Sequence, residues 1–182
     1  MAQIPSERRC ESFPPVARAD ARILILGSMP GVASLRARQY YAHPRNLFWP
    51  FLEEIFAMTP ARDYAQRLTR LQACHIAVWD VLAACERPGS LDGRIVRSTE
   101  TVNDFASFLA AHRQLVRICL NGGKAAEVFR RHVAGAMPDL VAGIEILHLP
   151  STSPANAGQS RAAKLARWRA ALTVDSPNGG QS

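Results

Sequence analysis

Residues 23–26 form an uninterrupted apolar run that stops at Gly27, and this boundary constrains the fold more than any other feature of the chain. A run without polar alternation is typical of a strand buried on both faces of a parallel sheet. The turn that follows, Gly-Ser-Met-Pro-Gly at 27–31, predicts a sharp exit at the edge of that sheet. Ligands bind preferentially at such edges, so this turn is the first candidate site.

Three later segments repeat the pattern of an apolar run followed by a polar or turn-forming residue. They cover residues 75–79, 115–120 and 144–149, and they end at Asp80, Asn121 and Pro150. Apolar residues with helical spacing predict helices between and after them, over residues 47–56, 61–71, 102–111, 125–133 and 160–172. This alternation indicates an α/β protein, a three-layer α/β/α sandwich with a central, mostly parallel four-stranded sheet. All four strand exits should then lie along one edge.

The remaining segments are expected to be irregular. Residues 1–21 contain two consecutive prolines and scattered charge, which predicts an extended arm. A basic loop is expected after Gly31, and a helix cap is expected near Thr101. The length predicts one domain over residues 1–175, with a disordered Gly- and Ser-rich tail over residues 176–182.

The charge of the chain is strongly basic, with 22 Lys and Arg against 15 Asp and Glu, a formal net charge of +7. Arginine supplies nearly all of the excess, because Lys124 and Lys164 are the only lysines. Arginine binds phosphate through two parallel hydrogen bonds, so a polyanionic partner is one interpretation. The other interpretation is a basic protein without such a partner, and charge alone does not decide between them.

The cysteines and apolar segments restrict the compartment and the chemistry. Four cysteines occur without a CxxC pair or a nearby Cys/His cluster, which predicts reduced thiols, no metal and no cofactor. Neither a secretory signal nor an apolar run of membrane-spanning length is present in the sequence. We therefore expect a cytoplasmic monomer without a membrane partner.

Each candidate residue at the predicted edge also has a purely structural interpretation. Asn46 precedes an apolar helix and could be its N-cap, while Phe48 could belong to the core. Asn121 could simply turn the chain. Asp80 is harder to explain this way, because a carboxylate directly after a buried strand must find a partner or shift its pKa. Residue by residue, both interpretations remain open.

Taken together, three motifs resemble the uracil-DNA glycosylase superfamily. These are GSMPG after the first strand, PRNLFW after a loop and LPSTSPAN after the last strand. The likeness runs from about Ser12 to Leu172, and RNLFW, WDVL and GSLD make it closest to the DNA-deoxyinosine (hypoxanthine-DNA) glycosylase branch. The resemblance implies an enzyme that removes a deaminated base from double-stranded or single-stranded DNA, with hypoxanthine first and uracil or xanthine as further candidates.

The resemblance also implies roles for individual residues. Asn46 would be the catalytic residue, with Ser28 the one side chain of the first motif able to assist it with the water. The base would be bound by Gly27, Met29, Phe48, Asp80 and Asn121, with Phe48 stacking on it. The DNA backbone would be bound by Pro30, Gly31, Ser151, Thr152 and Ser153. Where strongly flipping relatives carry a large apolar wedge, residues 155–158 are small and polar, which leaves Asn156 and Arg161 as substitutes.

The residue types are compatible with hydrolysis of an N-glycosidic bond. Negative charge develops on the departing base, so donors to the base and a positioned water are more useful than a strong nucleophile. Both lysines fall on predicted helices, so we expect no Schiff base and an abasic-site product without strand cleavage. An ionised Asp80 could accept from the N–H of hypoxanthine or uracil. Two alternatives remain, a non-catalytic nucleic-acid binding module and a nucleotide hydrolase that uses residues 122–124.

Overall fold

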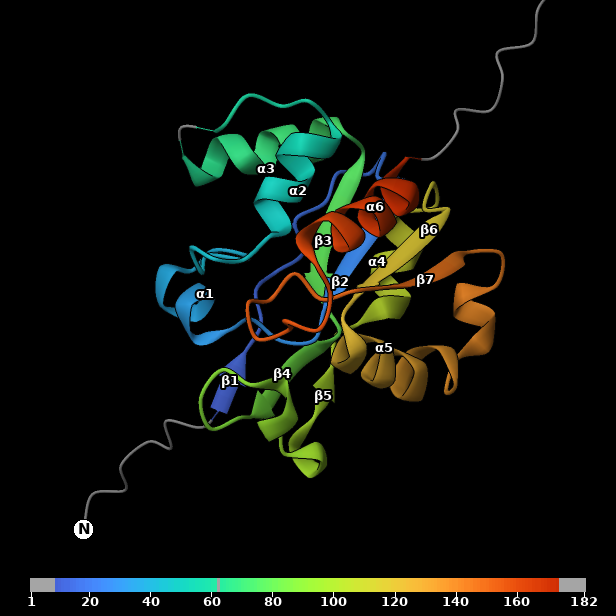
Figure 1. Cartoon of the computed structure of the whole chain (residues 1–182). Helices are drawn as coiled ribbons and strands as arrows, with labels where there is room; N and C mark the ends of the chain where they lie inside the picture. Colours follow the sequence, from blue (N-terminus) through green and yellow to red (C-terminus); the bar gives the residue numbers. More distant parts are fainter. Residues whose placement is uncertain (1–8, 62, 174–182) are drawn as a thin grey trace, which may run out of the picture.

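The computed structural model describes residues 9–61 and 63–173, and a four-stranded parallel sheet forms its centre. The strand order is β3 (Ile76–Asp80), β2 (Ile23–Gly27), β6 (Arg117–Asn121) and β7 (Glu145–Leu149), as Figure 1 shows. Gly27 pairs with Asp80, and Asn121 pairs with Leu149. The strands therefore end in register along one edge, as the sequence predicts.

Helices cover both faces of this sheet, so the predicted three-layer sandwich is confirmed (Figure 1). One face packs against α2 (Phe48–Ile55), α3 (Tyr64–Ala73) and α6 (Arg161–Leu172). The other packs against α4 (Phe105–Ala111) and α5 (Gly123–Phe129). Successive residues of β2 point to opposite faces, so its unbroken apolar run supplies both cores. No helix among the described residues is long and apolar enough to cross a membrane.

A second, antiparallel sheet was not predicted from the sequence. Its order is β1 (Arg9–Glu11), β4 (Leu82–Glu86) and β5 (Thr101–Val102). The predicted arm is therefore wrong at β1, and the predicted cap near Thr101 is wrong because that residue lies in β5 while Asp104 caps α4. β1 and β5 have only three and two residues, which is too short for a readable periodicity, and a single residue separates the end of β3 from the start of β4. The predicted tail lies outside the described residues.

The predicted loop after Gly31 contains a short helix, α1 (Val32–Ala37). Leu47 occupies the N-cap position of α2 where Asn46 was expected, although the Asn46 side chain still accepts from the Phe48 N–H. Ser160, the first residue of the predicted last helix, is the N-cap of α6 and accepts from the Ala163 N–H. Single helical turns complete the chain at η1 (Asp92–Arg94), η2 (Arg97–Thr99), η3 (Arg130–Ala134) and η4 (Pro138–Val141).

Candidate active site

A cavity of about 620 Å³ opens at the carboxyl ends of β2, β3 and β6, the edge that the sequence predicts for a ligand. Its volume is within the range of about 300–1,000 Å³ that is usual for small-molecule sites. All but two of the predicted site residues line it, namely Gly27, Ser28, Met29, Pro30, Gly31, Asn46, Asp80, Asn121, Ser151, Thr152, Ser153 and Asn156. The two that do not are Phe48 and Arg161.

Asn46 lies on the cavity wall, and its side chain is oriented by the start of α2. Its Oδ1 accepts from the Phe48 N–H at 2.9 Å, and its own N–H donates to the His43 carbonyl at 2.8 Å. The next N–H, from Leu47, donates to the Thr152 carbonyl at 3.0 Å, which joins this segment to the loop after β7. An amide held in this way can orient a water molecule, but it is a poor proton acceptor.

Phe48 is fully buried and does not reach the cavity. Its ring stacks on Tyr41, with the ring centroids 3.8 Å apart and the planes 17° from parallel. Tyr41 lines the cavity, so the aromatic surface available to a ligand belongs to Tyr41 and Phe48 supports it from behind. Tyr41 has a φ of 55°, a left-handed conformation that is rare for an aromatic residue and often marks functional sites. The sequence could not show which ring faces the cavity.

Asp80 lies on the cavity wall with 3% of its surface exposed, and its Oδ2 has no hydrogen-bond partner among the described residues. The carboxyl occupies the space beside Gly27, where an added Cβ would come within 2.6 Å of Oδ1. Burial and the negative charge of Asp92 raise the pKa of Asp80 to about 8, while Arg87 opposes the shift. This raised pKa favours the neutral carboxyl near pH 7, whereas we considered an ionised one from the sequence.

Arg87 was missed in the sequence, although it holds the GSMPG turn in place. The side chain is 1% exposed and donates from Nη1 to the Met29 carbonyl at 3.4 Å and from Nη2 to the Pro30 carbonyl at 2.6 Å. Its positive charge also lies near the carboxyls of Asp80 and Asp92. The sequence offered little signal for this role, because Arg87 follows Glu86 in a stretch where no helix or strand was predicted.

Asp92 is a second carboxyl in the cavity wall, and it too was missed. Burial raises its pKa, whereas a hydrogen bond with Ser28 and the charges of Arg87 and Lys124 act in the opposite direction. The Ser28 side chain, 5% exposed, is thus already engaged by a carboxyl. This contact favours a supporting role for Ser28 over direct handling of water.

Asn121 connects the end of β6 to the loop after β7. Its Nδ2 donates to Thr152 Oγ1 at 3.0 Å, and its Oδ1 accepts from the Thr152 N–H at 3.0 Å. One N–H and one lone pair of the amide are therefore used to hold the loop. Gly122 follows with a φ of 98°, and an added Cβ would come within 2.9 Å of the Ser151 side chain. Asn121 positions the loop and also lines the cavity, so its predicted contact with the base stays a prediction.

The loop of residues 151–158 is fixed from beneath by Lys164, which is 2% exposed. The Lys164 ammonium donates to the Ser151 carbonyl at 2.9 Å and to the Asn156 carbonyl. Arg161, predicted to bind DNA, lies outside the cavity and pairs with Glu54 at 2.8 Å. Within residues 9–61 and 63–173, no group of three or more His, Cys, Asp or Glu could hold a metal ion.

Comparison with known proteins identifies relatives of the chain. The family model described as Uracil DNA glycosylase superfamily matches residues 14–173. A Methanosarcina barkeri protein named Hypoxanthine DNA glycosylase is 38% identical over 118 residues, covering 64% of this chain and 73% of the relative. A Methanosarcina acetivorans protein of the same name is 37% identical over 145 residues, covering 79% and 86%.

The fold is similar to a solved structure with related sequence. The solution NMR structure of a candidate uracil DNA glycosylase from Methanosarcina acetivorans matches with a TM-score of 0.74 and 34% identity. The match covers 90% of this chain and 96% of that one.

Proposed function

The chain belongs to the uracil DNA glycosylase superfamily and is a DNA glycosylase, and we propose that hypoxanthine is the base that it releases from DNA. The observation that carries this proposal is the identity of 37% and 38% to two relatives named Hypoxanthine DNA glycosylase. The reaction is hydrolysis, in which a water oxygen bonds to C1′ and the C1′–N9 bond breaks. The electron pair of the broken bond leaves with the base, the water gives up one proton as its oxygen bonds to C1′, and the base takes up one proton, so free base and an abasic site remain.

Asn46 is proposed to orient the attacking water. It lies in the cavity, and its Oδ1 is already directed by the Phe48 N–H. The second lone pair of that oxygen can accept from a water, which supports this role. Because the glycosidic bond breaks with cationic character on the sugar, a positioned neutral water is sufficient and a strong base is not required.

Asp80 and Tyr41 are proposed to hold the base. Asp80 Oδ2 is a buried polar atom without a hydrogen-bond partner among the described residues, and both Asp80 and Tyr41 line the cavity. Hypoxanthine presents an N–H beside a carbonyl, and a neutral carboxyl offers the matching acceptor and donor. A donated hydrogen bond from Asp80 also stabilises the negative charge that develops on the departing base. The Tyr41 ring supplies a stacking surface.

The DNA backbone is proposed to lie along the turn at Pro30 and Gly31 and the loop that contains Ser151 and Ser153. Both segments line the mouth of the same cavity, and Arg87 and Lys164 hold their carbonyl groups from the protein side. Backbone N–H groups and hydroxyls held in this way suit phosphate oxygens. One chain supplies the whole residue set, which supports a monomer, and the free thiols of Cys74, Cys85 and Cys119 suit the reducing cytoplasm.

The direct test measures base release from DNA duplexes that contain one hypoxanthine, uracil or xanthine, with alkali-labile sites and free base as readouts. We expect hypoxanthine to be released fastest. Asn46→Ala should lower kcat by about 10²–10³-fold, as is typical when one positioned polar group is lost, while its affinity for the same duplex persists. Arg45→Ala provides the control, because it changes an exposed side chain next to Asn46 that does not line the cavity, and it should leave kcat unchanged.

Two results would contradict the proposal. Release of uracil alone would reject hypoxanthine as the substrate, and full activity of Asn46→Ala would reject the catalytic assignment. A non-catalytic nucleic-acid binding module predicts salt-dependent DNA binding with no base released from any duplex. The names of the relatives do not favour that alternative.

A further inference from the structure

The loop that follows β4 forms one rim of the cavity, and its exposed side chains have no part in the proposed chemistry. This loop, residues 87–95 and here called the Leu91 loop, contributes Ser90, Leu91 and Asp92 to the lining. Leu91 is 52% exposed, the largest value among the exposed large apolar side chains of the described residues. The 151–158 loop, which lines the same cavity, carries only small or polar residues at 155–158.

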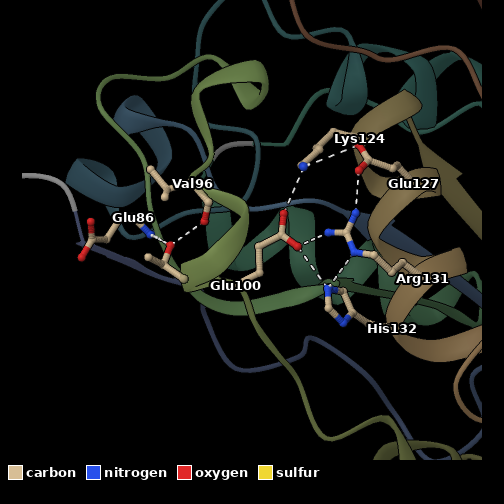
Figure 2. Close-up of polar contacts among 8 residues, drawn as sticks. Glu86, Val96, Glu100, Lys124, Glu127, Arg131 and His132 are labelled. Atoms are coloured by element: carbon tan, nitrogen blue, oxygen red, sulfur yellow. Dashed lines mark hydrogen bonds and ion pairs between the residues drawn. The ribbon is translucent and has the colours of Figure 1, made fainter.

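The base of the Leu91 loop is closed by hydrogen bonds. The Val96 N–H donates to the Glu86 carbonyl at 2.8 Å, and the Thr99 hydroxyl accepts from the Glu86 N–H at 2.8 Å. Behind it, the buried Glu100 carboxylate pairs with Lys124 at 3.0 Å, and it also pairs with Arg131 (Figure 2). The residues that flank the loop are therefore joined to each other, and Glu100, five positions after the loop, is joined to α5 and η3.

The interior of the loop is fixed as well. Arg87 Nε donates to the Gly89 carbonyl at 2.9 Å, and Ser90 Oγ accepts from the Val32 N–H at 3.1 Å. Ile95 and Arg87 are buried beneath the loop, whereas Leu91 projects between the anchored residues Ser90 and Asp92. A loop that buries an isoleucine and an arginine yet leaves its leucine in solvent at a cavity mouth presents an apolar contact for something outside the chain.

We propose that Leu91 is the apolar wedge that enters the DNA base stack while the damaged nucleotide occupies the cavity. This proposal rests on the proposed function. Extruding a nucleotide opens an apolar gap in the duplex, and glycosylases must compensate the lost stacking and pairing. Leu91 has the size and exposure to fill such a gap, and the exposed Arg94 and Arg97 next to it can contact the adjacent phosphates. Leu91 is therefore a positioning residue that touches DNA beside the reacting nucleotide.

The test compares Leu91→Ala with wild type on the same hypoxanthine-containing strand, once as a duplex and once single-stranded. A single strand has no complementary partner to lose, so only the duplex reaction needs the wedge. We expect Leu91→Ala to lower kcat/KM on the duplex about tenfold, the effect of losing roughly half of a leucine's burial, and to leave the single-strand value unchanged. Leu91→Met should restore the duplex value. Ile146→Ala, which changes an exposed side chain 37% accessible on β7, is the control.

A second measurement does not depend on catalysis. A 2-aminopurine placed beside an abasic site in a duplex reports on stacking, and wild type should change its fluorescence where Leu91→Ala does not. Three results would overturn the wedge. These are an equal loss of kcat/KM by Leu91→Ala on the duplex and the single strand, no loss on either substrate, or the same fluorescence change with Leu91→Ala as with wild type. Failure of wild type to release hypoxanthine from both substrates would instead overturn the proposed function, while the fluorescence comparison would still decide the wedge.

Discussion

Two segments meet at the cavity, the GSMPG turn and the 151–158 loop. Each is held by one buried cation that donates hydrogen bonds to backbone carbonyls. Arg87 holds the turn through Met29 and Pro30, and Lys164 holds the 151–158 loop through Ser151 and Asn156. The two cations differ in their surroundings. Arg87 lies near the carboxyls of Asp80 and Asp92, whereas no salt bridge among the described residues includes Lys164.

This difference separates two uses of a buried charge. On the Arg87 side, cation and carboxyls moderate one another, so removing one partner changes the protonation of the others. On the Lys164 side, burial is uncompensated by a carboxylate and lowers the pKa of the ammonium. We therefore expect the Arg87 side to govern base binding and its pH dependence, and the Lys164 side to govern only the shape of a loop.

The largest effect is expected from Arg87→Met, which keeps the apolar stem and removes the charge. It leaves the carbonyls of Met29 and Pro30 unpaired and takes a compensating charge away from Asp80. Breaking such a buried set should lower the free energy of unfolding by about 3 kcal/mol and abolish most base release. Urea denaturation at pH 7 measures the first effect, and the hypoxanthine duplex assay measures the second.

Arg94→Met is the matched control, because Arg94 is an exposed arginine of the same loop. Its stability should stay within about 0.5 kcal/mol of wild type, as for most exposed substitutions. If Arg87→Met were equally harmless, the buried arginine would not be what holds the turn. The expected difference between Arg87 and Lys164 would then be rejected.

A second prediction concerns Asp80→Asn, which makes the carboxyl permanently neutral. Folding raises the pKa of Asp80 from 3.8 to about 8. Between pH 4 and pH 8, the native state therefore keeps a proton on this carboxyl, whereas the unfolded state has lost it. Stability of the wild type therefore falls as pH rises from about 4 to 8, and Asp80→Asn lacks this loss. Between pH 5 and pH 9, the free energy of unfolding of the variant should rise by about 4 kcal/mol relative to wild type in denaturation experiments, about 1.4 kcal/mol for each pH unit from 5 to 8.

The same substitution tests the proposed use of the neutral carboxyl. If the neutral form binds the base, wild-type kcat/KM for hypoxanthine should decline above pH 8, and that of Asp80→Asn should not. A wild-type profile that rises through pH 8 would show that the ionised form is the active one. Asp104→Asn, a change in an exposed helix cap, controls for the loss of a carboxylate elsewhere.

The sequence predicted the central sheet and the position of the cavity because the four strand exits combine apolar runs with polar turns. It could not predict the small sheet, whose strands are too short for periodicity. Within the site, the choice between Phe48 and Tyr41 depends on ring packing, and the protonation of Asp80 depends on burial beside Gly27. Arg87 could not be recognised because its partners are backbone carbonyls 57 and 58 positions away. Adjacency of this kind exists only in the folded chain.

The smallest effect is expected from Lys164→Met, and it completes the comparison. The variant loses two hydrogen bonds to the carbonyls of Ser151 and Asn156, but it also removes the cost of burying an ammonium without a carboxylate. These terms oppose each other, so the free energy of unfolding should fall by only about 1 kcal/mol. KM for the hypoxanthine duplex should rise while kcat and its pH profile stay near wild type, because we propose that the loop contacts the DNA backbone but not the departing base. A shift in the pH profile of kcat in Lys164→Met would instead show that Lys164 is coupled to Asp80. The distinction between the Arg87 side and the Lys164 side would then be lost.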